Sequence, residues 1–288
     1  MKTIIVDAHA KINLSLDVLG KKESGYHELS MIMQEISLKD IVTIRQLDDD
    51  DNNIYIKCNR QEVPIDHRNI VYDAFKLITR KFNINKSIEV HIEKNIPISG
   101  GLAGGSTNAA AVLKGLNDIW NLKLTQKELM EIGVEIGADV PFCIMGGTAL
   151  SEGIGEKLTP LTPFRDKLLL LANPGIEVST GDVYKNLDLA NLSNRPDIKK
   201  IISAIENDDT ELLAKNMKNV LESVTIKMYP QIEDIKMQML NFGAVGSLMS
   251  GSGATVFGIF ENKENLETCK LQLQKTLKTV IGAKTMGV

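Results

Sequence analysis

The sequence predicts an α+β fold made of two domains. Runs of β-branched and alternating apolar residues fill the first 60 positions, and turn-forming clusters separate them, which is typical of strands joined by hairpins. Helical patterns follow, without the regular strand–helix alternation of a doubly wound sheet. A chain of 288 residues is long enough for two domains of about 150 residues each. Pro160 and Pro163 mark the boundary, so we expect domains over residues 1–160 and 161–288.

The N-terminal part is predicted to be a series of strands. Short apolar runs predict these strands over residues 3–6, 12–18, 31–36, 41–45 and 54–57. Turn clusters at residues 20–25 and 48–53 predict hairpin connections. The acidic run at residues 48–51 is most simply a solvated hairpin tip, and a metal-binding role there has little support.

The middle of the chain predicts helices around one further strand. Apolar residues share one face of a helix over residues 69–82, and residues 87–93 alternate as a strand. A glycine-rich segment over residues 97–107 leads into a strong helix start at Asn108. The spacing of Thr125 and Glu128 predicts a capping box that opens a helix over residues 126–136.

The rest of the chain keeps the same mixed order. Apolar residues 167–172 predict a buried strand, and helical patterns follow over residues 211–221 and 231–242. A second glycine-rich segment at residues 246–253 leads into a strand over residues 254–260. A helix over residues 263–277 and a final strand complete the prediction.

Composition narrows the class of protein. The chain has 33 Lys and Arg against 37 Asp and Glu, and this net charge of −4 argues against a broad nucleic-acid surface. Three widely spaced cysteines indicate neither a disulfide scaffold nor a zinc ribbon. Polar residues interrupt the N-terminal apolar run, unlike a signal peptide, and no run reaches the roughly 20 apolar residues of a membrane span. We expect a cytoplasmic monomer or homodimer that binds neither nucleic acid nor membrane.

The segment at residues 97–107 is the strongest functional signal. Its four glycines stand in two pairs between a strand and a helix, where glycine lets the backbone approach a ligand. Free N–H groups at a helix start form an anion site, and Ser106 and Thr107 can add hydroxyl donors or cap the helix. A P-loop would need a lysine after the glycines, and a Rossmann fingerprint would need glycine where Leu102 stands. We interpret the segment as phosphate-binding rather than as a tight turn without a ligand.

Two further segments have plain structural interpretations when taken alone. Asp139 precedes Pro141 at a predicted helix start, where a cap is a sufficient explanation. Lys11, Asn13 and Ser15 share one face of a strand, which a half-exposed sheet would turn to solvent. Neither segment by itself predicts a catalytic role.

Two more segments leave alternatives open. Tyr26 and His27 follow a turn, and they could stack on and hydrogen-bond a planar base or simply pack beside that turn. The glycine-rich residues 250–253 could form a second loop near phosphate or a connection between strands.

Together these segments resemble one family. Residues 97–112 resemble the phosphate-binding motif of the GHMP kinases, which include galactokinase and the homoserine, mevalonate and phosphomevalonate kinases. Residues 248–257 resemble the third motif of that family, and residues 10–14 resemble the first. Ala103 and Thr107 stand where the family often has Gly and Ser.

Two motifs are more specific. Residues 25–29 and 137–142 resemble the branch of the family whose members phosphorylate 4-diphosphocytidyl-2-C-methyl-D-erythritol. The resemblance implies an ATP-dependent kinase that uses Mg²⁺ and phosphorylates the 2-hydroxyl of that substrate in non-mevalonate isoprenoid biosynthesis. It also implies an N-terminal ribosomal-protein-S5-like domain and a C-terminal ferredoxin-like domain, with the active site between them.

The resemblance also implies roles for individual residues. Asp139 would be the base for the substrate hydroxyl, with Lys11 as its neighbouring cation. The residues implied to bind ATP are Asn69, Ile70, Lys94, Pro97, Ser99, Gly100, Gly101, Leu102, Ala103, Gly104, Gly105, Ser106 and Thr107. The residues implied to bind the second substrate are Asn13, Tyr26, His27 and Tyr184. The protein ligands of Mg²⁺ stay unknown.

Other interpretations compete with this one. The chain could be another GHMP kinase with a different alcohol substrate, although the segment at residues 25–27 favours a substrate with a cytosine. It could be a nucleotide-binding protein without catalysis, although the presence of both Lys11 and Asp139 favours an enzyme. A nucleic-acid-binding α+β domain is disfavoured by the net charge.

Overall fold

The protein is described by a computed structural model that covers residues 2–23, 25–192 and 194–287. The chain forms two compact units. Unit 1 comprises Met1–Ala10, Leu38–Ile98 and Ala103–Met145, and unit 2 comprises Lys11–Ser37, Ser99–Leu102 and Gly146–Val288. The domain division at residue 160 stays a prediction.

Two long strands contribute to both units. β1 (Thr3–Lys21) and β2 (His27–Gln46) pair with each other, and a turn after Lys21 joins them. This confirms the predicted hairpin at residues 20–25. The separate runs at residues 3–6 and 12–18 belong to one strand, because the polar residues between them alternate with the apolar ones and do not interrupt the extended backbone.

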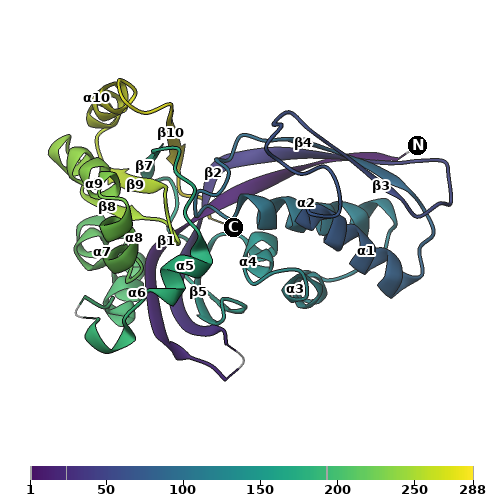
Figure 1. Ribbon diagram of the computed structural model, residues 1–288, viewed down its shortest axis with the longest axis horizontal. Helices are drawn as coiled ribbons and strands as arrows, with labels where there is room; N and C mark the ends of the chain where they lie inside the picture. Colours follow the sequence, from purple (N-terminus) through teal and green to yellow (C-terminus); the bar gives the residue numbers. More distant parts are fainter. Residues whose placement is uncertain (1, 24, 193, 288) are drawn as a thin grey trace. The chain divides into compact units, whose positions relative to one another are not determined.

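Unit 1 packs helices against a sheet. The end of β2 pairs antiparallel with β4 (Ile88–Glu93), and β4 pairs in parallel with β3 (Ile54–Cys58). Figure 1 shows α1 and α2 along one side of these strands. The helices of the unit are α1 (Ile70–Phe82), α2 (Gly104–Ile119), α3 (Gln126–Val134) and α4 (Val140–Met145). Their apolar faces and the strands bury one continuous hydrophobic core.

Local sequence explains where these helices begin and end. Asn69 caps α1 by accepting a hydrogen bond from the Val71 N–H, and Asn83 ends that helix in the left-handed region at φ +56°. Thr125 and Glu128 form the predicted capping box of α3.

Unit 2 contains the start of β2 and a second sheet. The start of β2 pairs with β5 (Thr148–Gly153), which pairs with β6 (Lys157–Pro160). The second sheet is antiparallel in the order β10-β7-β9-β8. Its strands are β7 (Leu168–Asn173), β8 (Gly246–Met249), β9 (Val256–Phe260) and β10 (Thr279–Lys284).

The remaining helices all belong to unit 2. They are α5 (Thr180–Lys185), a 3-10 turn at Leu189–Asn191, α6 (Ile198–Glu206), α7 (Thr210–Asn216), α8 (Glu222–Met228), α9 (Gln231–Asn241) and α10 (Lys263–Leu273). Within the described ranges, no helix has both the length and the apolar character needed to span a bilayer.

One expected turn and two expected helix bounds are wrong. The acidic residues 48–51 do not form a hairpin tip, because β3 after them pairs with β4 and not with β2. The helix expected from Asn108 begins earlier, at Gly104. The helix expected to reach residue 221 ends at Asn216, because the following backbone pairs with β1: the Leu16 N–H donates to the Lys218 carbonyl at 2.9 Å.

Candidate functional site

The unit 2 part of the glycine segment, Ser99–Leu102, packs against a second glycine-rich turn. The Ser250 hydroxyl donates to the Gly101 carbonyl at 2.9 Å. Gly101 has φ +73°, and a Cβ there would lie 2.1 Å from the Ser250 carbonyl oxygen, so both conformation and space require glycine. The Lys11 N–H donates to the Leu102 carbonyl at 3.2 Å. The turn at residues 250–253 is therefore built against the predicted phosphate-binding segment.

The unit 1 part of the segment forms the start of α2. Ala103 is the N-cap residue at φ +57°, and its side chain makes no capping hydrogen bond. The first N–H groups of a helix have no partner within it, so the N–H groups of Gly104, Gly105 and Ser106 present donors and the positive end of the helix dipole. This arrangement suits a phosphate group.

The Lys94 ammonium binds the first turn of α2 from inside unit 1. It donates to the Gly104 carbonyl at 2.9 Å, to Asp40 Oδ2 at 2.5 Å and to Asn108 Oδ1 at 3.1 Å. A lysine ammonium has three protons, and these contacts engage all three. A contact of Lys94 with adenine would therefore come from its backbone or its aliphatic stem.

Asp40 completes this buried network. Its carboxylate is fully buried, and it also accepts hydrogen bonds from the backbone N–H groups of Asn95 and Ile96 and from the Asn108 amide. Burial lowers the pKa of Lys94, and the neighbouring Asp40 carboxylate opposes that shift. The sequence analysis missed Asp40 and Asn108. Neither has a local signal, because the contact that explains Asp40 joins residues 54 positions apart.

Two more of the predicted ATP-binding residues lie at the start of α1. Asn69 is buried; its amide donates to the Pro64 carbonyl at 2.7 Å, and its oxygen caps the helix. Ile70 lies beside the helix start, since a Cβ added to Gly105 would lie 3.6 Å from its Cγ2 atom. Unit 1 thus brings Ile70, Lys94 and the start of α2 close together.

The two hydroxyl residues of the segment differ. The Thr107 side chain is buried and donates to the His9 carbonyl at 2.7 Å, so its hydroxyl proton is engaged within unit 1. Ser106 is half-buried in the first turn of α2. The expectation that either residue caps the helix is wrong, because Ala103 is the N-cap.

Lys11, Asn13 and Ser15 lie on one face of β1, as expected, but that face is not half-exposed. The three residues are 5%, 0% and 0% exposed. The Lys11 ammonium donates to Asn13 Oδ1 at 2.8 Å, and the Asn13 amide lies 3.5 Å from Met31 Sδ. Burying a lysine costs free energy unless it has polar partners. This face of β1 is therefore a buried polar surface and not the solvent side of a sheet.

Asp139 immediately precedes α4 in unit 1. Its carbonyl accepts the N–H of Cys143 at 3.1 Å, and Pro141 lies in the first turn of the helix, as expected. The side chain is half-buried. Lys11 belongs to unit 2 and Asp139 to unit 1, so their pairing stays a prediction.

Unit 2 gathers the three aromatic residues that were predicted to bind the second substrate. The rings of His27 and Tyr184 stack with centroids 4.8 Å apart, and the Tyr26 side chain is 63% exposed. All three line a cavity of about 610 Å³, which we call the aromatic cavity. Burial, followed by the nearby Lys21 ammonium, lowers the pKa of His27, which disfavours the charged form of its ring.

The aromatic cavity also contains residues that the sequence analysis missed. Lys21, Thr180 and Lys185 line it together with the aromatic residues. Lys185 adjoins Tyr184 in sequence, and Lys21 lies just before the turn that leads to Tyr26. Their closeness in sequence to predicted substrate-binding residues could therefore have identified both lysines. Two cations beside stacked rings suit a ligand that carries both a base and phosphate groups.

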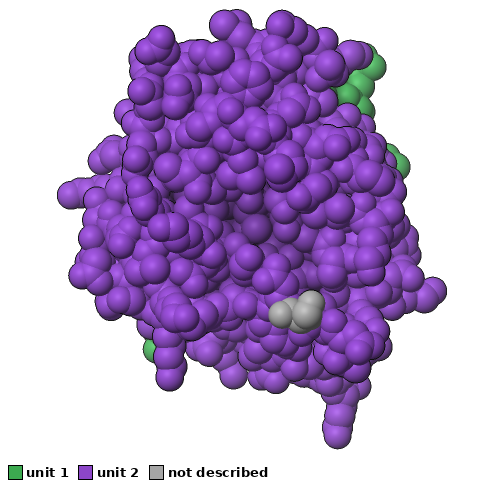
Figure 2. All heavy atoms as spheres, turned by 90° about the vertical axis from the view of Figure 1, so that its left-hand side faces the viewer, with its two compact units in different colours: residues 1–10, 38–98, 103–145 green, residues 11–37, 99–102, 146–288 purple. Residues whose placement is uncertain are grey.

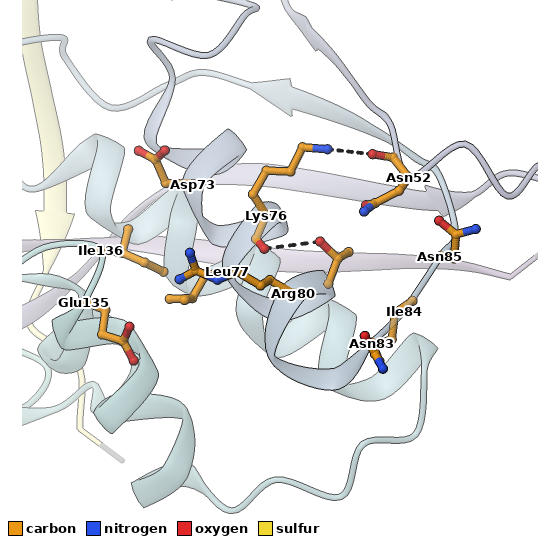
Figure 3. A pocket seen from close by; sticks show the side chains of 11 residues that line it. Asn52, Asp73, Lys76, Leu77, Arg80, Asn83, Ile84, Asn85, Glu135 and Ile136 are labelled. Carbon is orange, nitrogen blue, oxygen red and sulfur yellow. Dashed lines mark hydrogen bonds between the residues drawn. The ribbon is translucent and has the colours of Figure 1, made fainter.

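Another cavity, of about 720 Å³, lies in unit 1 beside α1. Figure 3 shows that side chains of α1 and of residues 83–85 and 135–136 surround it. Lys76 reaches across one side and donates to the Asn52 carbonyl at 2.7 Å. None of the predicted site residues lines this cavity.

Comparison with known sequences supports the interpretation of the motifs. The N-terminal domain model of the GHMP kinases matches residues 69–147, and the C-terminal model matches residues 201–279. A Clostridium botulinum protein named 4-diphosphocytidyl-2-C-methyl-D-erythritol kinase is 50% identical over 281 residues, covering 98% of this chain and 99% of that protein. A Clostridioides difficile protein of the same name is also 50% identical, covering 97% of this chain and 94% of that one.

Solved structures give the same result. The crystal structure of a 4-(cytidine 5'-diphospho)-2C-methyl-D-erythritol kinase matches with a TM-score of 0.82 and 26% identity, covering 99% of this chain and 100% of that one. A homoserine kinase from Cytophaga hutchinsonii matches with a TM-score of 0.80 at 20% identity, covering 100% and 95%, and shows the same fold. The predicted two-domain α+β fold is confirmed, and the chain belongs to the GHMP kinase family.

Proposed function

We propose that this chain is an ATP-dependent kinase that phosphorylates the 2-hydroxyl of 4-diphosphocytidyl-2-C-methyl-D-erythritol, a step of non-mevalonate isoprenoid biosynthesis. The observation that carries the proposal is the 50% identity, over nearly the whole chain, to proteins named for that activity. The competing GHMP kinases act on alcohols that carry no base, whereas unit 2 here has a cavity lined by aromatic rings.

The aromatic cavity has the chemistry that a cytidine diphosphate needs. Tyr26 exposes a flat face, on which a base can stack. His27 and Tyr184 already stack on each other, so a base would either stack on Tyr26 or separate that pair. Lys21 and Lys185 supply positive charge for the diphosphate. Asn13, on the buried face of β1, would contact the substrate near the reacting hydroxyl.

The nucleotide half of the proposal rests on the start of α2. The N–H groups of Gly104, Gly105 and Ser106 would hold ATP phosphates, and the left-handed Gly101 lets the backbone turn there. Asn69, Ile70 and Lys94 would line the adenine pocket, and Pro97, Ser99, Gly100 and Leu102 would complete the loop.

The reaction needs positioning and charge stabilisation more than covalent chemistry. Asp139 would accept the proton of the substrate 2-hydroxyl. The hydroxyl oxygen would bond to the γ-phosphorus of ATP, and the bond between that phosphorus and the bridging oxygen would break, so that ADP leaves. Lys11 would keep Asp139 ionised and counter charge on the transferred group; a neighbouring cation lowers the pKa of an aspartate by about 1–3 units.

When bound with ATP, Mg²⁺ would supply positive charge that offsets the negative charge of the phosphate groups. In the described ranges, no group of three or more His, Cys, Asp or Glu side chains is placed to hold a metal ion. We propose that phosphate oxygens and water supply most of its ligands, with Ser106 as a nearby hydroxyl. Mg²⁺ accepts such a coordination shell readily.

A coupled ADP-release assay tests the proposed function. With Mg²⁺ and ATP, we expect turnover with 4-diphosphocytidyl-2-C-methyl-D-erythritol and none above background with mevalonate or homoserine. Faster turnover with mevalonate or homoserine would contradict the proposed substrate and identify that alcohol as the better one. Nucleotide binding without turnover on any of the three would point to the non-catalytic alternative.

The Tyr26→Ala variant tests the proposed base contact. Stacking of one base on an aromatic side chain is worth about 1–3 kcal/mol in single-stranded nucleic-acid complexes, so KM for the cytidine substrate should rise while KM for ATP stays unchanged. The exposed Tyr55 of β3 provides the control, and Tyr55→Ala should change neither constant. An unchanged cytidine-substrate KM in Tyr26→Ala would remove Tyr26 from the site.

A further inference from the structure

A cavity in unit 2 is separate from every residue assigned above to ATP or to the second substrate. It has a volume of about 520 Å³ and lies among α7, α8, α9 and β8. Figure 2 shows unit 2 from the left-hand side of Figure 1, where α7 and α9 lie. The surface of unit 2 in this view is hollowed near its centre. The volume lies within the roughly 300–1,000 Å³ of typical small-molecule sites.

The walls of this cavity are largely apolar. Its apolar lining residues include Met217, Val220, Ile226, Leu240, Val245 and Leu248. They come from separate elements that converge on one space: Val220 precedes α8, Leu240 lies in the last turn of α9 and Leu248 belongs to β8. Leu240 is 39% exposed, whereas the adjacent Met239 is buried. An apolar body would bury this surface.

The charged side chains of the cavity are mostly lysines. Its charged lining residues are Lys215, Lys218, Lys227, Lys236, Glu222 and Glu233. Both glutamates bind the same lysine: Lys236 Nζ lies 2.9 Å from Glu222 and 3.1 Å from Glu233. This leaves Lys215, Lys218 and Lys227, so the lining carries an excess of positive charge. We call it the lysine-rimmed cavity.

The groups that face these three lysines from outside the cavity neutralise them only in part. Lys215 makes an exposed contact with Glu211 at 3.4 Å. The hydrogen bond from Asn191 is the main cause that lowers the pKa of Asp188, and the nearby Lys227 charge adds a small contribution. No ion pair of Lys218 occurs among the described residues. Lys218 is half-buried, which holds its positive charge close to the apolar wall.

The polar residues of the inner wall, the buried Asn219 and the half-buried Glu222, already have hydrogen-bond partners. The Asn219 amide donates to the carbonyls of Met249 and Gly251, each at 2.8 Å, and Glu222 accepts the Met249 N–H at 2.9 Å. The segment that they hold contains Ser250, which binds Gly101. A ligand in the cavity would thus meet a rigid inner wall, with uncompensated charge only at the lysines.

We propose that the lysine-rimmed cavity binds a small molecule with an apolar body and an anionic head group. The apolar body lies against Val220, Ile226 and Leu240. The head group lies at Lys218 and Lys227, where it gains charge-assisted hydrogen bonds that an uncharged head could not form. This site is independent of the proposed kinase reaction, because it shares no residue with either substrate site.

Titration calorimetry on the full chain tests the proposal, with n-octyl phosphate as the probe. We expect saturable binding of one molecule per chain with a Kd below about 1 mM. Octyltrimethylammonium has the same tail with a cationic head, and inorganic phosphate has the head without the tail. Both should bind at least about tenfold more weakly. Equal binding of the two octyl compounds would show that the lysines play no part and would overturn the proposal, as would the absence of saturable binding.

Paired variants locate the site. Lys218→Gln with Lys227→Gln should weaken octyl phosphate binding by at least about tenfold. The matched control is Lys199→Gln with Lys263→Gln, which removes two exposed lysines of α6 and α10 that lie outside the cavity, and it should leave the Kd unchanged. Equal losses in both pairs would indicate a general charge effect and would contradict the proposal. Unchanged ADP release from both pairs would establish that the kinase fold is intact.

Discussion

The Lys94 ammonium lies 2.9 Å from the Gly104 carbonyl oxygen. Because Lys94 also pairs with the buried Asp40, this contact links a buried ion pair to the first turn of α2. The ammonium occupies the space beside Gly104, where a Cβ would lie 2.8 Å from Nζ. Gly104 is therefore needed for space, whereas Gly101 is needed for both its positive φ and its space. The N–H groups proposed to bind ATP phosphates are thus held by Lys94, Asp40 and Asn108.

Asp40→Asn should destabilise the protein. The substitution leaves the buried Lys94 ammonium without its carboxylate, and breaking such a pair costs about 3–5 kcal/mol, which urea unfolding would measure. The neighbouring Lys39 pairs with Asp7 at 2.5 Å on the surface, and Asp7→Asn should cost only about 0–1 kcal/mol. Equal losses in the free energy of unfolding for Asp40→Asn and Asp7→Asn would show that burial does not make the Asp40–Lys94 pair more important than the surface pair.

Gly104→Ala and Gly105→Ala should have opposite effects on stability. The first places a Cβ against Lys94 and against Ile96, 3.1 Å away, and overpacking of this kind costs about 1–3 kcal/mol. The second places a Cβ at an ordinary 3.6 Å from Ile70, and alanine in a helix gains up to about 1 kcal/mol over glycine. Thermal unfolding of both variants checks the order; a more stable Gly104→Ala would show that Lys94 moves aside freely.

Ala103→Gly should stabilise the protein. Ala103 holds φ +57°, a conformation that costs an L-residue about 1 kcal/mol and glycine almost nothing. The control is Ala110→Gly in the interior of the same helix, which should instead lose about 1 kcal/mol or more. Chemical denaturation of both variants gives the comparison, and a loss of stability in Ala103→Gly would disprove the strain.

Asp139→Asn tests the proposed base. We expect kcat to fall by about 10²–10⁴-fold with KM for ATP nearly unchanged, because a positioned base acts on the proton transfer and not on nucleotide binding. Asp118→Asn, at an exposed position of α2, is the matched control and should keep full activity. Near wild-type turnover in Asp139→Asn would show that Asp139 is not the base and serves only as a helix cap.

Burial and, to a smaller extent, Lys21 should lower the pKa of His27. The positive charge of Lys21 disfavours the imidazolium, so Lys21→Gln should raise the pKa of His27, while burial continues to lower it. With Lys21 present, the ring stays neutral further into the acid range than an ordinary histidine with a pKa near about 6.5. NMR titration of the His27 ring in both proteins measures the shift. A lower pKa in the variant would contradict the assigned cause.

Much of this protein could be predicted from local sequence. The turn at the glycine pairs in residues 97–107 and the capping box at Thr125 depend on neighbouring residues, because φ values and caps are set within a few positions. The capping box and the hairpin between β1 and β2 were predicted correctly from such signals. The hairpin tip at residues 48–51, the capping role of Ser106 or Thr107 and several helix ends were not. The family resemblance rests on the same kind of short motif.

Only the tertiary structure decided which polar residues are buried and what they bind. Lys11 and Ser15 have the strand spacing that the sequence predicts, but their burial follows from what covers that face of β1. Asp40 gives no local sign of its role, because its partner Lys94 lies 54 positions away, just after β4. Burial and long-range hydrogen bonds depend on the simultaneous packing of distant segments, and no window of sequence contains that information.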